Sequence, residues 1–293
     1  MPGEPLTARV RWCTGPLARP VCGGKDQMPD RIFDGPGAQT VRSSRGEGDE
    51  QGAERSELAL VHTIVHELRQ PLTVIRGQLQ LGRRRIGRDP ERERAAIDLS
   101  LVQVDRMSAL ISELLDLSAL VADGLPFAVA PFDLIAAVSE AVTRHEYEEP
   151  RRIVFEQPRA PVEAAGDPAR VAQILDNLLS NALKYSEPPA PIVVSIVAGG
   201  GSALVRVEDQ GPGVAETDRY RLFTPFYRAE SARLIPGSGL GLHISRGLAE
   251  RQGARLWLAE SSPAGSAFLL ELPLSLATRA QDAGLSVLRA TPA

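Results

Sequence analysis

The segment 66–72 (His-Glu-Leu-Arg-Gln-Pro-Leu) places a histidine beside a carboxylate in a helix-forming region. Apolar residues around it recur in alternating steps of three and four, which is a heptad seam: Leu58, Val61, Val65, Leu68, Leu72, Ile75 and Leu79. His66 follows the seam residue Val65, so it lies about 100° further round the helix and points outward. A solvent-facing imidazole on a rigid helix suits nucleophilic chemistry with a partner that docks from outside. A plain surface histidine on a coiled coil gives the same pattern, so this segment alone leaves both interpretations open.

A candidate base-binding turn lies far downstream, at 209–214 (Asp-Gln-Gly-Pro-Gly-Val), directly after a strand-like run. A buried carboxylate at the end of a strand can accept a hydrogen bond from an exocyclic amine such as that of adenine. Gly211 and Gly213 let the backbone approach a base without an intervening Cβ. Taken alone, Asp209 and these glycines also fit a simple tight turn.

A second glycine-rich turn, 237–242 (Gly-Ser-Gly-Leu-Gly-Leu), opens a predicted helix. Glycines ahead of a helix N-terminus expose backbone N–H groups and the positive end of the helix dipole, which favours a phosphate group. No Gly-Lys-Ser/Thr follows, so the turn is not a Walker loop. Its third glycine comes too early for the dinucleotide-binding pattern.

One face of a predicted helix carries Asn177, Asn181 and Lys184 at i, i+4 and i+7. Asn carbonyl oxygens can ligate Mg²⁺, and Lys184 is one of only two lysines in the chain, so this face fits a cation plus a polyphosphate. The solvated polar edge of an amphipathic helix is the alternative. Arg228, at the end of an aromatic-rich stretch, is the candidate for a further phosphate contact.

These motifs follow one another in a fixed order: asparagine helix, Asp-Gly turn, Phe-Tyr-Arg, glycine-rich turn. That order resembles the ATP-binding domain of sensor histidine kinases, which belong to the GHKL (Bergerat) ATPase superfamily. The His66 segment resembles the phosphoacceptor box of the HisKA dimerisation domain. The resemblance covers about residues 56–273. It implies a helical-hairpin dimerisation domain, forming a four-helix bundle in the dimer, followed by an α/β-sandwich ATP-binding domain.

The resemblance gives the His66 segment a catalytic role. His66 takes the γ-phosphoryl group of ATP, and Glu67 holds the other ring N–H and acts as the base. The phosphoryl group then passes to an aspartate in the receiver domain of a separate response regulator. Four residues after the histidine the family usually has Thr or Asn, linked to orienting water for dephosphorylation of the regulator, whereas this chain has Gln70. We therefore expect a protein histidine kinase with reduced or altered phosphatase activity.

In the ATP-binding domain the resemblance implies that the cofactors are ATP and Mg²⁺. Asp209 binds the adenine amine, Asn181 ligates Mg²⁺, and Asn177 supports it. The remaining positions contact the phosphates or shape the turn around them: Lys184, Tyr185, Arg228, Gly237, Gly239, Leu240 and Gly241. Catalysis then rests mainly on positioning and on charge neutralisation.

The elements that position these residues divide the chain into four parts. Residues 1–55 hold nine glycines and six prolines, so we expect a disordered or loosely ordered segment. Residues 56–122 form the hairpin, with one helix over 56–86 kinked by Pro71 and a second helix that begins at Pro90 after the N-cap Asp89. A lone hairpin cannot cover its own apolar face, so we expect a homodimer.

Residues 123–274 form the predicted ATP-binding domain, with a hinge at 123–131, and residues 275–293 form a weakly structured tail. The predicted helices and strands are 133–148, 168–185 and 240–252, and 153–155, 192–198, 203–208, 254–260 and 266–272. They cluster rather than alternate, which predicts helices on one face of a mostly antiparallel or mixed sheet.

Composition limits the other function classes. A formal net charge of −4 argues against nucleic-acid binding, and Cys13 and Cys22 make neither a disulfide framework nor a zinc site. No apolar run reaches the ~20 residues of a membrane span, so we expect no membrane insertion and a cytoplasmic protein. Two alternatives stay open: a degenerate kinase that only scaffolds regulators, and another GHKL protein such as an anti-sigma-type serine kinase or a clamp ATPase. The predicted hairpin argues against the second.

Overall fold

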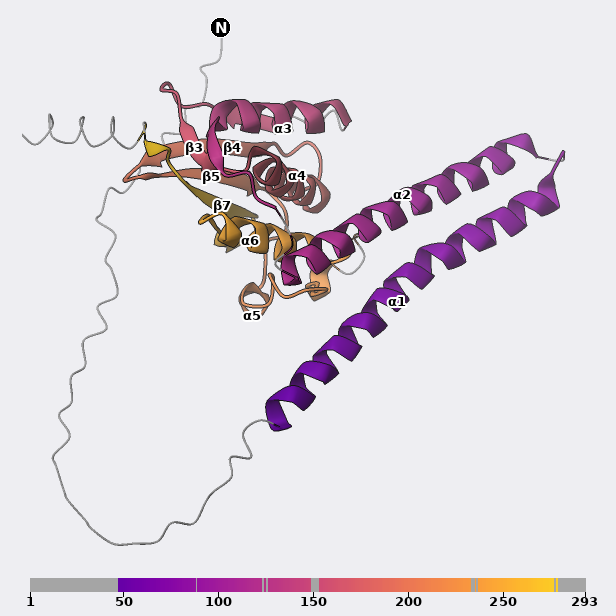
Figure 1. Cartoon of the computed structure of the whole chain (residues 1–293). Coiled ribbons are helices and arrows are strands. Elements are labelled where there is room, and N and C mark those ends of the chain that lie inside the picture. The colour runs from indigo at the N-terminus through magenta and orange to yellow at the C-terminus, as the bar shows by residue number, and fades with distance from the viewer. Residues whose placement is uncertain are drawn as a thin grey trace, which may run out of the picture. The chain divides into compact units, whose positions relative to one another are not determined.

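A computed structural model describes residues 47–87, 89–122, 124, 126–148, 153–232, 235, 237–276 and 278. The described chain begins with two long helices and continues into a mixed α/β domain (Figure 1). This arrangement matches the predicted hairpin followed by an ATP-binding fold. Cys13 and Cys22 lie outside the described residues, as does nearly all of the predicted tail.

Helix α1 spans Glu47–Arg85 and continues unbroken through Pro71. It begins nine residues before the predicted start, so the expectation of disorder up to residue 55 was wrong for 47–55. The two glycines in this stretch hid the start of the helix from the sequence-based prediction. The kink predicted at Pro71 stays a prediction.

Helix α2 spans Pro90–Val121, and its start is the predicted one. The side chain of the N-cap Asp89 accepts a hydrogen bond from the backbone N–H of Arg92 at 3.2 Å, and Pro90 occupies the first helical position. Helices α1 and α2 diverge from the turn that joins them (Figure 1). Large apolar side chains along both helices are therefore left exposed: Val61, Val65, Leu72, Leu79, Leu101, Val104, Ile111 and Leu115.

The second domain is built on a five-stranded sheet of order β2-β4-β5-β7-β6. The strands are β2 Ile153–Glu156, β4 Ile192–Gly199, β5 Ser202–Asp209, β6 Arg255–Ser262 and β7 Gly265–Pro273. Strands β2 and β4 pair parallel, and the other pairs are antiparallel. The mixed, mostly antiparallel sheet predicted from the sequence is confirmed.

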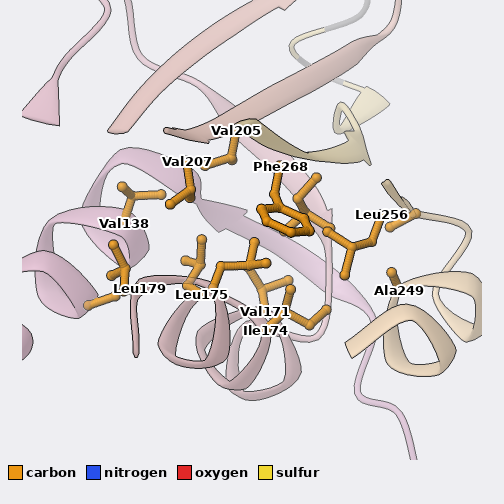
Figure 2. Close-up of a cluster of buried hydrophobic side chains, with 14 of the residues drawn as sticks. Val138, Val171, Ile174, Leu175, Leu179, Val205, Val207, Ala249, Leu256 and Phe268 are labelled. Carbon is orange, nitrogen blue, oxygen red and sulfur yellow. The ribbon is translucent and has the colours of Figure 1, made fainter. Parts of the chain in front are cut away.

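Three helices pack on one face of this sheet: α3 Leu134–Glu148, α4 Pro168–Tyr185 and α6 Gly241–Arg251. Alternate side chains of β5 are buried, which is the period of a strand with one covered face. Figure 2 shows Val205, Val207 and Phe268 from the sheet facing Ile174 and Leu175 of α4. This single apolar layer fixes α4 and the end of β5 relative to each other.

A smaller sheet was missed by the sequence-based prediction. Strand β1 (Ala130–Asp133) pairs antiparallel with β3 (Glu163–Gly166). Each has four residues, too few to show an alternating pattern, and β1 contains a proline. The short helix α5 (Glu216–Arg219) and a 3₁₀ turn over Glu230–Ala232 were also missed.

Asp167, the N-cap of α4, joins this domain to the chain that precedes it. Its carboxylate accepts hydrogen bonds from Ala169 N at 3.0 Å and Arg170 N at 3.3 Å, as an N-cap does. It also accepts one from Ala128 N at 2.9 Å. Residue 128 and β1 are therefore held by the domain, and the hinge expected at 123–131 stays a prediction.

Candidate active site

The predicted nucleotide-binding residues meet in one cavity. Its walls come from α4, from the end of β5 and the turn after it, from β7, and from the glycine-rich turn before α6. Ten of the predicted positions line it: Asn177, Asn181, Lys184, Tyr185, Asp209, Gly213, Arg228, Gly237, Gly239 and Gly241. Gly211 and Leu240 do not line it and act through the backbone around it.

Asp209 ends β5 with a side chain that is 7% exposed. Its Oδ1 accepts hydrogen bonds from Gly211 N at 2.8 Å and Ser266 N at 3.3 Å. Burial raises the pKa of this carboxyl, and these two N–H groups only partly offset the effect. Among the described residues no hydrogen bond uses Oδ2, so this oxygen is available to an amine in the cavity.

The glycines after Asp209 serve the packing of the turn itself. A Cβ on Gly211 would lie 2.6 Å from the carbonyl oxygen of Tyr185. Gly213 has a φ of +72°, and its Cβ would lie 2.0 Å from the carbonyl oxygen of Ser262. At both glycines the space that a Cβ would take is filled by the protein's own backbone, and the approach of a base to this turn stays a prediction.

The asparagine face of α4 is held by a chain of side-chain contacts. Asn177 Nδ2 donates to Ser245 Oγ of α6 at 2.9 Å, and Asn181 Nδ2 donates to Asn177 Oδ1 at 3.4 Å. Asn177 therefore orients Asn181, and its supporting role at a Mg²⁺ ligand stays a prediction. With its Nδ2 engaged, Asn181 has its carbonyl oxygen left for a hard cation, so the residue fits Mg²⁺. Among the described residues, no group of three or more His, Cys, Asp or Glu side chains is placed to hold a metal ion.

Arg228 lines the cavity and also organises the loop that follows it. Its guanidinium donates to the carbonyl oxygens of Ala232 and Ile235. Tyr185 stands nearby: burial raises the pKa of its phenol, and the positive charge of Arg228 opposes that shift. The pair supplies one cation and one hydroxyl to the same wall.

The glycine-rich turn approaches α4 and the preceding loop closely. A Cβ on Gly241 would lie 2.3 Å from Asn177 Oδ1, and one on Gly239 would lie 2.8 Å from the carbonyl oxygen of Tyr227. Leu240 is fully buried in the core, so its side chain contacts no ligand. Its backbone N–H donates to Ser238 Oγ at 3.1 Å and thereby shapes the turn.

Several lining residues were missed by the sequence-based prediction. Ser266 and Phe268 come from β7, and Glu113 comes from α2. The β7 residues follow from strand pairing, since Asp209 lies opposite Ser266 in the register. Nothing in the local sequence marks Glu113, because it reaches the cavity only through the packing of α2 against the second domain.

The predicted phosphoacceptor lies on the other domain. His66 is exposed on α1, as its place beside the seam predicted. Gln70 Nε2 lies 3.3 Å from His66 Nδ1, one helical turn along. Among the described contacts, none joins Glu67 to the ring, so the first neighbour of Nδ1 is Gln70. The role of Glu67 as base stays a prediction.

Two protein-family profiles match the chain in this order. Residues 56–122 match the His Kinase A (phospho-acceptor) domain. Residues 166–276 match the histidine kinase-, DNA gyrase B- and HSP90-like ATPase. The first match contains His66, and the second contains every predicted nucleotide-binding residue.

Curated relatives are sensor kinases. The signal transduction histidine-protein kinase/phosphatase MprB of Mycobacterium sp. is 32% identical over 228 residues, covering 73% of this chain and 43% of MprB. Sensor protein kinase WalK of Staphylococcus epidermidis is 26% identical over 233 residues, covering 78% of this chain and 38% of WalK. The chain thus spans less than half the length of these relatives.

Solved structures agree on the fold. The histidine kinase AdeS of Acinetobacter baumannii matches with a TM-score of 0.59 at 25% identity, over 72% of this chain and 98% of AdeS. Full-length ShkA, solved in complex with AMPPNP, matches with a TM-score of 0.55 at 25% identity, over 74% of this chain and 46% of ShkA. Within the part of the chain that the structure describes, no helix has the length and apolar character needed to cross a bilayer.

Proposed function

The chain belongs to the sensor histidine kinases of two-component systems, and on that premise we propose that it phosphorylates its own His66 from ATP. The observation that carries the proposal is the joining of the separated sequence motifs in one cavity, on a chain whose other domain exposes His66. A degenerate scaffold would not need the asparagine, aspartate and cationic positions all to line one site.

The chemical step is an in-line displacement at the γ-phosphorus. The lone pair of His66 Nε2 forms the P–N bond, the bond to the leaving ADP oxygen breaks, and the ring proton must leave from Nδ1. Gln70 stands at Nδ1, where its amide, turned with oxygen toward the ring, would accept that N–H and leave the Nε2 lone pair free. Glu67, its sequence neighbour, is the proposed acceptor of the proton.

The cavity would bind the ATP that donates the phosphoryl group. Asp209 would hold the adenine amine, while Lys184, Tyr185 and Arg228 would contact the phosphates. The turn 237–241 would place backbone N–H groups and the N-terminus of α6 beside them. Mg²⁺, held by Asn181 and the phosphates, would neutralise charge on the transferring group.

The partners follow from the family. We infer a homodimer through α1 and α2, because their exposed apolar seam needs a second surface. The phosphoryl group would pass to a receiver-domain aspartate of a separate response regulator. The reaction takes place where ATP is available, which assigns the catalytic region to the cytoplasm.

Incubation with γ-labelled ATP and Mg²⁺ tests the proposal. We expect acid-labile label on the wild type and none on His66→Gln, with ATP binding unchanged because the cavity is intact. His62→Gln is the matched control, since His62 lies one turn earlier on the exposed side of α1 and should be labelled normally.

Two results would overturn it. A wild-type chain that binds ATP but takes up no label would be a scaffold rather than a kinase. Acid-stable label that persists in His66→Gln would indicate a serine kinase of the same superfamily.

A further inference from the structure

Helix α2 sends one carboxylate into the nucleotide cavity. Glu113 lines the same wall as Lys184, Gly237 and Ser238, which is the polyphosphate end of the proposed ATP site. It comes from the hairpin, whereas the other lining residues belong to the second domain. A negative side chain at a phosphate-binding position is the opposite of what the ligand requires.

The carboxylate is engaged there by a specific contact. Ser238 Oγ donates to Glu113 Oε2 and in turn accepts from Leu240 N at 3.1 Å. Glu113 is thereby linked through one hydroxyl to the start of α6, where backbone N–H groups favour an anion. The positive charge of Lys184 acts on it from α4. These are the groups that a terminal phosphate would use.

The C-terminal turns of α2 hold the carboxylate in place. Asp116 accepts from Gln173 Nε2 at 2.6 Å and lies 3.8 Å from Arg170 Nη1, both on α4. Leu120 packs over Gly247 of α6, where an added Cβ would lie 3.2 Å from Leu120 Cδ1. Glu113, Asp116 and Leu120 are spaced i, i+3 and i+7, so one face of α2 makes the whole contact.

We propose that Glu113 is a resident competitor of the ATP polyphosphate, which α2 inserts when it packs on α4 and α6. The inference rests on the proposed ATP site. Two anions cannot share the Ser238 hydroxyl and the Lys184 charge, so polyphosphate binding expels the carboxylate and weakens the packing of α2. By reciprocity, packing of α2 lowers the affinity for ATP by the same factor. Nucleotide loading and release of the ATP-binding domain from the hairpin are then one linked event.

The surroundings of Glu113 disfavour the ionised form of its carboxylate. Burial raises the pKa of Glu113, and the Asp116 charge adds to this, against the lowering by Ser238 and Lys184. The packed state therefore disfavours its charge, which makes Glu113 displaceable by a better anion.

The test is nucleotide affinity across a series of ligands, measured by calorimetry on the full chain with Mg²⁺. Glu113→Gln keeps an acceptor for Ser238 and removes the charge. We expect a non-hydrolysable ATP analogue to bind about fivefold to tenfold more tightly, ADP to gain less, and adenosine, which has no phosphate, to be unchanged. Glu113→Ala, which also removes the contact, should gain at least as much. Asp105→Asn is the control, because it removes the same charge from an exposed position of α2.

Each outcome decides the inference. Equal affinities for the ATP analogue in wild type and Glu113→Gln, or weaker binding by the variant, would overturn it, since Glu113 would then be neutral or a supporting ligand. A gain that is equal for adenosine and the ATP analogue would also overturn it, because the effect would not involve phosphate. Failure of the wild type to bind any nucleotide would instead refute the proposed function.

Discussion

The two domains of this chain differ in how much of their apolar surface is buried within a single chain. In the ATP-binding domain Leu175 is 1% exposed and Leu270 is 0% exposed. On the hairpin the seam residues Leu72 and Leu79 are 52% and 53% exposed. A sheet with helices on one face closes its core within the chain, whereas two diverging helices do not. The proposed nucleotide site therefore lies within one chain, and we infer that the exposed apolar face of the hairpin needs a second surface to cover it.

The contrast extends to the chemical groups. In the proposed ATP site, side chains from two helices are hydrogen-bonded to one another, as in the chain from Ser245 through Asn177 to Asn181. On the hairpin, His66 is exposed and has one described contact, with Gln70. A fixed site suits the proposed ATP, and an exposed histidine suits the two successive partners proposed for it, the ATP-binding domain and a regulator.

The largest effect should come from breaking the hairpin seam. Leu79→Glu places a charge at the seam in both copies, so we expect the dimer dissociation constant to rise by about a thousandfold or more, from the loss of roughly 2 kcal/mol of apolar burial per copy plus charge burial. Nucleotide binding should not change, because the proposed site lies within one chain. Sedimentation equilibrium and calorimetry measure the two quantities.

Gln78→Glu is the matched control for that experiment, because this substitution adds the same charge one residue away from Leu79 and off the seam. A Leu79→Glu protein that stays dimeric would show that the exposed seam is not the dimer interface. If nucleotide binding were lost together with the dimer, the nucleotide site would depend on the second copy, which contradicts the proposed difference between the domains.

Part of this organisation was readable from the sequence. The α4 face, the glycine-rich turn and the His66 seam are local patterns, because helical period and N-cap chemistry involve residues a few positions apart. Glu113 could not be identified in this way, since its role depends on α2 packing against α4. The early start of α1 at Glu47 was hidden by the glycines of that stretch, and β1 and β3 were too short to show a period.

A smaller effect distinguishes two buried aspartates within the ATP-binding domain. Burial raises the pKa of Asp209, whereas for Asp167 the effect of burial is exceeded by hydrogen bonds from Ala128, Arg170 and Ala169, which lower its pKa. Asp209→Asn should leave the free energy of unfolding equal or higher, since a buried charge disappears, while ATP affinity falls by about a hundredfold from the mismatch with the adenine amine. Asp167→Asn should cost about 1 kcal/mol of stability, because an amide nitrogen cannot accept the hydrogen bond from Ala128 N, and should leave ATP affinity unchanged.

The free energy of unfolding should depend on pH in opposite directions for the two aspartates. Ionised Asp167 stabilises the fold above its unfolded pKa, and that stability is lost as pH falls through its lower folded pKa. Ionised Asp209 destabilises the fold, and that cost disappears as pH falls through its raised folded pKa. At neutral pH, denaturant unfolding should give Asp167→Asn a lower free energy of unfolding than the wild type, and Asp209→Asn an equal or higher one. Both differences should shrink as the pH falls into the acid range. Differences of the same sign would contradict the assignment of one aspartate to structure and the other to binding.

The smallest effect is expected at Gln70, where the exposed chemistry of the hairpin depends on one side chain. If the Gln70 amide orients the water that dephosphorylates a regulator, Gln70→Ala should slow that step about fivefold, which corresponds to one neutral hydrogen bond of about 1 kcal/mol. Gln70→Asn, which restores a residue type usual in the family, should dephosphorylate the regulator at least as fast as the wild type. The measurement is the decay of a phosphorylated regulator that accepts the phosphoryl group from this chain. Decay that is no slower in Gln70→Ala would remove Gln70 from this role and leave only its contact with His66 Nδ1, whose loss should then appear in the rate of autophosphorylation.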